Sequence, residues 1–192
     1  LAMSHAALVR SSVVISVGHP REYALAGLEQ KRKGLYTIGW QFSGFAERWL
    51  MREDHRHLRH WLRQHPDAAR CVRDLARPGR LTAGLNWYRA NLLPAVLRSW
   101  PPCRVPTLGI WSSDDHCLAE DQMRRSSRRM DAPWRYERIE GAGHWLPLVT
   151  VDFLAALIAR VPASGSYTVL DDETPQLHEL VARVLSRPLD RD

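Results

Sequence analysis

The sequence predicts an α/β fold in which parallel strands alternate with helices and an all-helical segment is inserted between them. Strand-like apolar runs lie toward both ends of the chain, at residues 11–17, 107–111 and 134–140, with helical patterns among them. Residues 35–100 contain several helical patterns and no strand signal. The alternation at both ends indicates a parallel sheet, because parallel strands are joined through crossover helices.

The first strand is predicted at "SSVVISV", residues 11–17, which is β-branched and ends at a Gly-His-Pro turn. Its hydrophobicity is continuous and does not alternate, so we expect a strand buried on both faces. The next segment, "REYALAGLEQKRK" at residues 21–33, has the composition of a helix.

The middle of the chain is rich in tryptophan and arginine and is predicted to be helical. Two of its helices are expected to begin near Asp54 and Pro66, residue types that favour helix starts. A further helix places Leu81, Leu85 and Tyr88 on one face, at spacings of four and three residues.

A buried strand is predicted at residues 107–111, and a further strand at residues 134–140. Helices are expected at residues 118–130 and 148–161, the second with a strongly apolar face. The tail from about residue 162 begins with the linker-like "ASGSY", a short strand and one more helix are expected after it, and no function is assigned to residues 162–192.

Charge and hydrophobicity narrow the classes of function. The net charge of +6 comes almost entirely from arginine, and only "RRSSRR", residues 124–129, is a tight basic cluster. A solvated helix face is expected there, and nucleic acid is not an expected partner. No apolar run approaches the ~18 residues that span a membrane, and the N-terminus lacks the order of a signal peptide. The sequence therefore favours a cytoplasmic protein with no membrane partner.

The three cysteines Cys71, Cys103 and Cys117 are an odd number without CxxC spacing. This pattern argues against a disulfide framework and against a zinc cluster. Cys117 lies close in sequence to the carboxylates discussed next, but a buried apolar thiol is expected in preference to a nucleophile.

Candidate catalytic residues follow the last two predicted strands. Asp114 and Asp115 come just after the strand at residues 107–111, and His144 follows the next strand. The carboxyl ends of parallel strands form the ligand crevice of an open sheet. Taken singly, a Gly-His turn is a common structural element and an Asp pair a common helix cap. Their joint order favours the acid and base of a triad whose nucleophile comes earlier in the chain.

Three stretches carry a resemblance to a known family. "VVISVGHPREY", "VPTLGIWSSDDHCL" and "EGAGHWLP" resemble segments of the α/β-hydrolase fold, and within it of the epoxide hydrolases. The resemblance extends from about residue 1 to residue 161. It implies that Asp115, in preference to Asp114, is the triad acid and that His144 is the base.

Two further stretches resemble lid motifs of epoxide hydrolases. "LNWYRAN" is similar to the helix that carries one ring-opening tyrosine, which would be Tyr88, and "YTIGWQFSGFAE" to the segment that carries the other, which would be Tyr36. Either tyrosine alone could be an ordinary core aromatic. Together they favour an epoxide hydrolase over a haloalkane or haloacid dehalogenase, an alternative that Trp40 beside Tyr36 keeps open.

The resemblance implies a division of the chain into four parts. It corresponds to the C-terminal part of an α/β-hydrolase parallel sheet with a helical lid, or cap, inserted into it. Residues 1–34 would form a core strand and connecting helix, residues 35–100 the lid, residues 101–161 the core elements with the acid and histidine loops, and residues 162–192 the tail.

The nucleophile that this family requires is missing from the sequence. No Ser, Asp or Cys has glycines on both sides in the G-x-D-x-G or G-x-S-x-G pattern. The resemblance implies that the nucleophile and earlier strands precede Leu1, so we expect a truncated form that is inactive when isolated. The first strand would have an unpaired edge. A homodimer or another chain that covers this edge is therefore an expected partner.

For the complete enzyme, the resemblance implies that an epoxide becomes a vicinal diol through a covalent aspartyl ester, with no metal or organic cofactor. The substrate would be a small apolar epoxide or a related compound. Trp40, Phe42, Trp145 and Leu146 are expected to shape an apolar pocket. The alternatives are a dehalogenase, a serine ester hydrolase of the same fold, or a non-catalytic remnant.

Overall fold

The computed structural model describes residues 1–149, 151 and 155 of the chain. The tail at residues 162–192 and most of the helix predicted at residues 148–161 lie outside the described residues. Within the described part, no helix combines the length and apolar character needed to cross a membrane.

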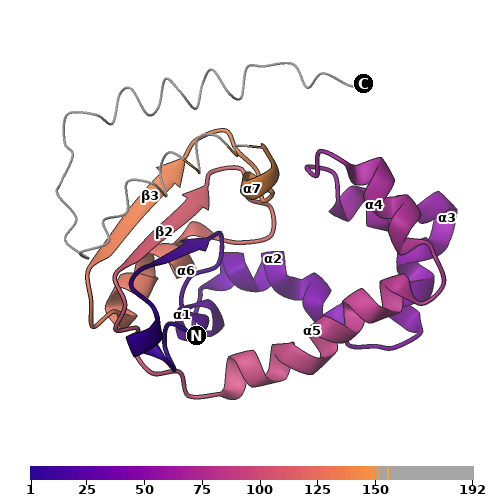
Figure 1. Ribbon diagram of the computed structural model, residues 1–192. Coiled ribbons are helices and arrows are strands. Elements are labelled where there is room, and N and C mark those ends of the chain that lie inside the picture. Colours follow the sequence, from indigo (N-terminus) through magenta and orange to yellow (C-terminus); the bar gives the residue numbers. More distant parts are fainter. Residues whose placement is uncertain (150, 152–154, 156–192) are drawn as a thin grey trace.

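A three-stranded parallel sheet forms the first layer of the structure (Figure 1). The strands β1 (Ser12–Ile15), β2 (Thr107–Ser112) and β3 (Trp134–Ile139) lie side by side in chain order. The central strand β2 is buried along its whole length. One apolar core lies against the sheet and comprises Leu108, Ile110, Ile139, Ala142 and Leu146, with Val13 and Ile15 packed on it.

Strand β1 differs from its prediction in burial. The β-branched run does form a strand, but all four residues are only half-buried. The physical reason is its position, because β1 pairs with β2 on one side and ends the sheet within the described residues. The prediction of burial on both faces was therefore wrong.

The segment predicted as one helix at residues 21–33 forms parts of two helices. Helix α1 (Pro20–Ala24) has proline at its first position, and the His19 Nδ1 atom accepts a hydrogen bond from the Arg21 N–H at 3.2 Å. The backbone at Leu25 leaves helical geometry, and Gly27 is extended before helix α2 (Leu28–Gly39) begins.

Helices α3 (Phe45–Trp61), α4 (Ala68–Leu75) and α5 (Arg80–Leu97) complete the helical layer. In Figure 1, α3 and α4 lie far from the sheet, while α2 and α5 run from the sheet toward them. Helix α3 is kinked at residues 52–55, so its second half starts near the predicted start at Asp54.

A second apolar core joins helices α2, α3, α4 and α5. The buried members are Trp40, Ala46, Leu50, Leu58, Leu62, Val72, Leu81 and Leu85. Tyr36, Tyr88 and Trp145 are half-buried and pack against this core. The helical segment therefore carries its own hydrophobic core, and Trp145, from the loop after β3, packs against it.

The basic cluster at residues 124–129 is not simply a solvated face. It forms the end of helix α6 (Glu120–Arg125) and a 3₁₀ turn, η2 (Ser126–Arg129). The Nε atoms of Arg125 and Arg129 lie 3.1 and 2.7 Å from the two carboxylate oxygens of Glu22, a residue of α1 that is only 1% exposed. The prediction was wrong for these two arginines, because a buried carboxylate needs cationic partners.

Candidate active site

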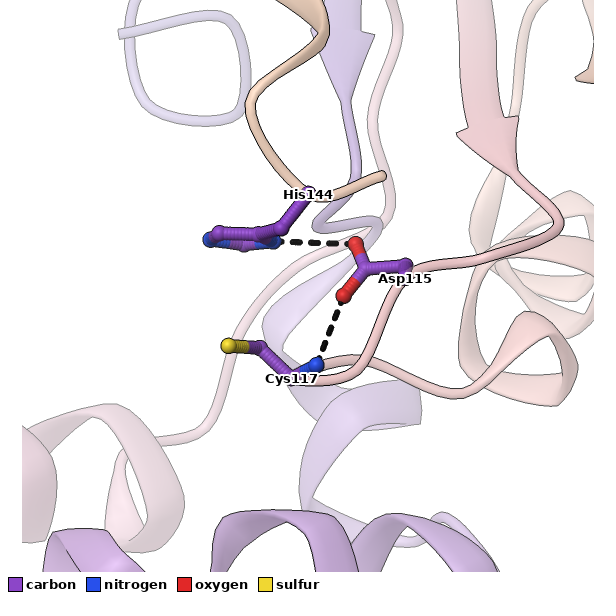
Figure 2. A group of neighbouring side chains, drawn as sticks. All are labelled: Asp115, Cys117 and His144. Carbon is purple, nitrogen blue, oxygen red and sulfur yellow. Dashed lines mark hydrogen bonds and ion pairs between the residues drawn. The ribbon is translucent and has the colours of Figure 1, made fainter. Parts of the chain in front are cut away.

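The turn after β2 holds the Asp115 carboxylate in one orientation. Its Oδ1 atom accepts hydrogen bonds from the backbone N–H groups of Cys117 and Leu118, at 2.8 and 2.9 Å. Its Oδ2 atom lies 2.9 Å from the Nδ1 atom of His144 (Figure 2). Asp115 is only 2% exposed, so both oxygens face protein groups and the carboxylate has little freedom to rotate.

The surroundings of Asp115 also set its charge. Burial opposes ionisation of this carboxyl, but the hydrogen bond and positive charge of His144 and the N–H groups of Leu118 and Cys117 outweigh it, and the pKa is lowered. Asp115 is therefore an anion at neutral pH. An anionic acceptor at Nδ1 favours the proton on that nitrogen, which leaves Nε2 of His144 to take up a proton.

The loop after β3 brings His144 to this carboxylate. Gly141 adopts a positive φ of 69°, which glycine allows without strain, and its N–H donates to the Ser113 Oγ at 2.8 Å. The Ser112 Oγ donates to the Gly143 carbonyl at 2.9 Å. The acid and histidine loops are thus tied together beyond the ends of their strands. Asp114, the other candidate acid, is exposed and accepts a hydrogen bond from the Ser113 hydroxyl.

A mostly apolar cavity of about 300 Å³ lies beside His144. It is lined by Val17, Pro20, Tyr23, Tyr36, Thr37, Trp87, Tyr88, Asn91, Leu92, Ala95, Leu118 and His144. Both predicted tyrosines therefore share a cavity with the predicted base. Burial, above all, raises the pKa of each phenol, and the neighbouring Cys117 adds to this effect. Both side chains are consequently neutral and able to donate hydrogen bonds.

Comparison with solved structures places this arrangement in a known fold. The chain superposes on an epoxide hydrolase from Bacillus megaterium in complex with an inhibitor, with a TM-score of 0.66 over 82% of this chain and 62% of that one, at 13% identity. A structure of epoxide hydrolases from metagenomes of hot environments, described as members of the alpha/beta hydrolases superfamily, gives a TM-score of 0.61 over 78% of this chain and 58% of that one, at 20% identity. The chain has the α/β-hydrolase fold.

Sequence comparison agrees with the resemblance to epoxide hydrolases. The chain is 26% identical over 164 residues to Epoxide hydrolase 3 of Xenopus tropicalis, a match that covers 76% of this chain and 44% of that protein. No protein-family model matches the sequence. The chain spans less than half the length of the Xenopus tropicalis relative. The α/β-hydrolase fold and the resemblance to epoxide hydrolases that the sequence predicts are both confirmed.

Cys117 is the third side chain of the candidate site (Figure 2). It is 2% exposed, and burial, followed by the charge of Asp115, raises its pKa to about 11. The thiol is therefore protonated at neutral pH, which is unfavourable for a nucleophile. Its sulfur nevertheless lies close to polar atoms. The sulfur, a carboxylate oxygen of Asp115 and a ring nitrogen of His144 are all within 4.8 Å of one another.

The four residues predicted to shape the substrate pocket lie in different places, and none of them lines the cavity beside His144. Trp40 is buried between Tyr36 and Tyr88, with ring centroids 4.6 and 4.7 Å away. Trp145 packs edge-on against Trp61. Phe42 is 60% exposed and Leu146 is fully buried in the core beneath the sheet.

Sequence analysis missed Gln64, which connects the helical segment to both loops. Its Nε2 atom donates to the Asp114 carbonyl at 3.0 Å, and its Oε1 atom accepts from the His144 N–H at 3.4 Å and contacts the His116 Nδ1 atom. A Cβ atom at Gly143 would lie 2.8 Å from this amide. Gln64 lies in the connection between α3 and α4, and no motif in the sequence indicates its role.

The other missed residues line the cavity. Tyr23 follows the Gly-His-Pro turn and offers a third phenol. Asn91, Leu92 and Ala95 lie three, four and seven residues after Tyr88 on helix α5. This spacing corresponds to one helical face, so helical periodicity starting from Tyr88 would have found them.

Proposed function

We propose that this chain contributes the acid–base pair and the ring-opening tyrosines of an epoxide hydrolase. One observation carries the proposal: Tyr36, Tyr88 and His144 line the same apolar cavity, and the Asp115 carboxylate contacts the Nδ1 atom of His144. An epoxide needs an apolar site, hydrogen-bond donors for its ring oxygen and a base that activates water. In this proposal residues 35–100 are the lid that supplies the donors.

The proposed chemistry has two steps. A carboxylate nucleophile from outside these 192 residues attacks one epoxide carbon, the carbon–oxygen bond breaks, and the bonding electrons go to the ring oxygen. Tyr36 and Tyr88 donate hydrogen bonds to this oxygen as its negative charge develops, when such bonds are most valuable. One phenol then supplies the proton that turns the alkoxide into an alcohol, and the enzyme carries an ester.

His144 acts in the second step. Its Nε2 atom takes a proton from a water molecule, and the resulting hydroxide attacks the ester carbonyl to release a vicinal diol and the free carboxylate. Asp115 stabilises the imidazolium that forms and holds the ring in the required tautomer. The proton on Nε2 then returns to the phenolate of the tyrosine that was spent in the first step.

The proposal that the nucleophile lies outside this chain rests on two findings. The G-x-D-x-G and G-x-S-x-G patterns are absent from the sequence, and the matched relatives are considerably longer than this chain. The purified 192-residue protein should therefore form no diol from styrene oxide. Turnover would show that a nucleophile within the chain has been overlooked.

Binding tests the site without requiring turnover. Titration of the protein with 1-phenyl-1,2-ethanediol, the product expected from styrene oxide, should quench tryptophan fluorescence through Trp87 in the cavity wall. Tyr36→Phe and Tyr88→Phe should each weaken binding about 3- to 10-fold, the loss of roughly one hydrogen bond.

Tyr136→Phe is the matched control, because the Tyr136 hydroxyl donates to Glu120 Oε1 at 2.8 Å and does not line the cavity. Equal losses in all three variants would contradict the assignment of Tyr36 and Tyr88 to the substrate site.

One observation favours a dehalogenase as the second candidate. The indole N–H groups of Trp61 and Trp145 are buried and have no hydrogen-bond partner among the described residues. Such donors can bind a halide ion. Chloride or bromide titration should then quench tryptophan fluorescence in the native protein but less in Trp145→Phe. A halide effect that depends on Trp145, together with no binding of the diol, would favour this candidate over the first.

A further inference from the structure

The cluster at the candidate active site contains three kinds of metal ligand. The Asp115 carboxylate, the Cys117 thiol and the His144 imidazole each have a donor atom within 4.8 Å of the other two (Figure 2). A thiolate and an imidazole together suit Zn²⁺ and its spectroscopic substitute Co²⁺ better than they suit Mg²⁺ or Ca²⁺. We propose that these three side chains form a binding site for Zn²⁺, in which the cation takes the place of the proton between His144 and Asp115.

The distances require only a small adjustment. Zinc bonds of about 2.0–2.3 Å place tetrahedral ligand atoms roughly 3.3–3.6 Å apart. The His144 Nδ1 and Asp115 Oδ2 atoms, now 2.9 Å apart, would separate slightly. The sulfur, at up to 4.8 Å, would approach by about 1 Å. Rotation about the Cα–Cβ bond of Cys117 can supply a shift of this size.

The surroundings of the cluster also suit a metal ion. Asp115 Oδ1 is fixed by two backbone N–H groups, so Oδ2 is the oxygen that would face the ion. The neutral Tyr36 phenol is close enough to Cys117 to oppose the rise in the pKa of its thiol, and it would stabilise a bound thiolate. His144 borders the cavity, which leaves room for a fourth ligand on that side. Two anionic ligands would neutralise the dication within a largely buried site.

Protons balance in the binding step. The Cys117 thiol loses its proton to solvent, because a coordinating thiol is deprotonated by the metal. Neutral His144 transfers its hydrogen from Nδ1 to Nε2 through solvent and binds the metal with Nδ1. One proton is released for each ion bound, so affinity should rise with pH. The acid–base pair and the metal complex exclude each other, since both need Nδ1 of His144.

Cobalt titration of the purified protein tests the site directly. Co²⁺ should bind with one-to-one stoichiometry and give a thiolate-to-cobalt charge-transfer band in the near ultraviolet, and Zn²⁺ should abolish that band by displacement. Cys117→Ser should remove the band and weaken binding by at least about 100-fold, since loss of a supporting partner alone costs about 10–100-fold. A protein that shows no cobalt band, or a band that persists in Cys117→Ser, would overturn the proposal.

Two other cysteines provide the controls. Cys71 Sγ lies 3.5 Å from His65 Nε2 and is a rival thiol–imidazole pair, while Cys103 is buried beside Thr107. Cys71→Ser and Cys103→Ser should keep the full band. Loss of the band in Cys71→Ser would assign the metal to the rival pair and refute the proposed site.

Two further measurements separate metal binding from folding. Far-ultraviolet circular dichroism should show that Cys117→Ser keeps its helices. Should that variant unfold, His144→Gln serves instead: it should weaken cobalt binding at least tenfold, and cobalt affinity equal to that of the native protein would overturn the proposal. Nitrogen-15 spectra of the His144 ring should show that the N–H hydrogen is on Nδ1 without metal and on Nε2 once Zn²⁺ is bound. No epoxide is present in these experiments, so their outcome is independent of the proposed hydrolase activity.

Discussion

The two halves of the candidate site are held in place by different forces. Asp115 and His144 come from the loops after β2 and β3, and hydrogen bonds to backbone groups fix the direction of the carboxylate. Tyr36 and Tyr88 come from α2 and α5 and are held mainly by aromatic contacts with Trp40 between them. Hydrogen bonds fix the orientation of the first pair, whereas packing fixes the position of the second.

This difference has a consequence for how each half would fail. Removing one hydrogen-bond partner leaves a buried charge or N–H group unpaired, which is a local fault with a strong dependence on pH. Removing a central ring leaves a cavity into which neighbouring helices can shift. The two kinds of damage should therefore be separable by experiment.

The largest expected effect is in the helical half. Trp40 is 5% exposed and also contacts Trp61, so Trp40→Ala should lower the free energy of unfolding by about 3–5 kcal/mol. Tyr36 and Tyr88 should lose their fixed positions, and diol binding should fall with them. Urea unfolding and the fluorescence titration measure the two effects.

Phe42→Ala is the control for Trp40→Ala, because Phe42 lies nearby in sequence but is 60% exposed. Its expected cost is within roughly 0.5 kcal/mol. In Trp40→Ala the nitrogen-15 signals of His144 should still show the proton on Nδ1. Loss of that signature would mean that the two halves of the site are not independent.

Asp115→Asn removes the charge of the carboxylate in the sheet half of the site. It should lower the free energy of unfolding by about 3 kcal/mol at neutral pH, near the upper end for hydrogen bonds to buried charged groups. The folded state lowers the pKa of Asp115 below its usual 3.8. The charge therefore stabilises the fold above pH 3.8, and this stabilisation is lost as the pH falls through the lowered value of the folded state.

The difference in unfolding free energy between native protein and Asp115→Asn should consequently be greatest near neutral pH and shrink in acid. Denaturant unfolding at a series of pH values measures it. Asp114→Asn, at the exposed neighbouring carboxylate, should change stability little at any pH. A difference that stays constant with pH would contradict the assigned charge state of Asp115.

A smaller loss in the free energy of unfolding, about 1.5 kcal/mol, is expected for Glu47→Gln, which tests the ion pair between helices α3 and α5. Glu47 Oε1 and Oε2 accept bonds from the Arg89 guanidinium at 2.9 and 3.1 Å, linking α3 to α5. The hydrogen bond to Arg89 is the main reason that the pKa of Glu47 is lowered from 4.5 to about 2.

This pair should stabilise the protein fully above pH 4.5 and lose its contribution between pH 4.5 and about 2. Unfolding at pH 7 and pH 3 measures the change. Glu53→Gln, an exposed partner of Arg56 in α3, is the control and should have little effect. An equal loss of unfolding free energy in both variants would contradict the special role assigned to Glu47.

The smallest effect is expected where the two halves meet. Gln64→Ala removes the amide that bonds to the Asp114 carbonyl and the His144 N–H, and should cost roughly 0.5–1.5 kcal/mol. The ring signals of His144 should shift, because its loop loses a contact with the helical segment. Gln41→Ala, which removes a bond within the end of α2 at Thr37, should leave those signals unchanged. Equal shifts in both variants would contradict a specific link through Gln64.

The sequence predicts the sheet half well because local patterns determine it. Asp115 and His144 each follow a strand by a few residues, and the pairing of Ser112 with Ile139 brings the two strand ends together. Parallel pairing alone thus places the loops side by side. The choice of Asp115 over Asp114 needed the family resemblance, and in the structure Asp115 is the one that contacts His144.

The helical half is predicted less completely because its contacts depend on how helices pack. Gln64 meets Asp114 across 50 residues of sequence, and nothing local indicates that contact. Phe42 was expected in the pocket but follows the end of α2, where the chain turns outward to solvent. The break between α1 and α2 lies at residues 25–27. The helical spacing of apolar residues continues through this stretch, although the backbone there leaves helical geometry.

The arginines at residues 124–129 affect what this protein can attract. Three of the four are already paired with carboxylates of the same molecule, two of them with the buried Glu22. A polyanion that approached this segment would have to compete with internal carboxylates, and would gain less from the release of mobile counterions than the sequence suggests. The net charge of +6 therefore overstates the attraction that this part of the surface offers to phosphate.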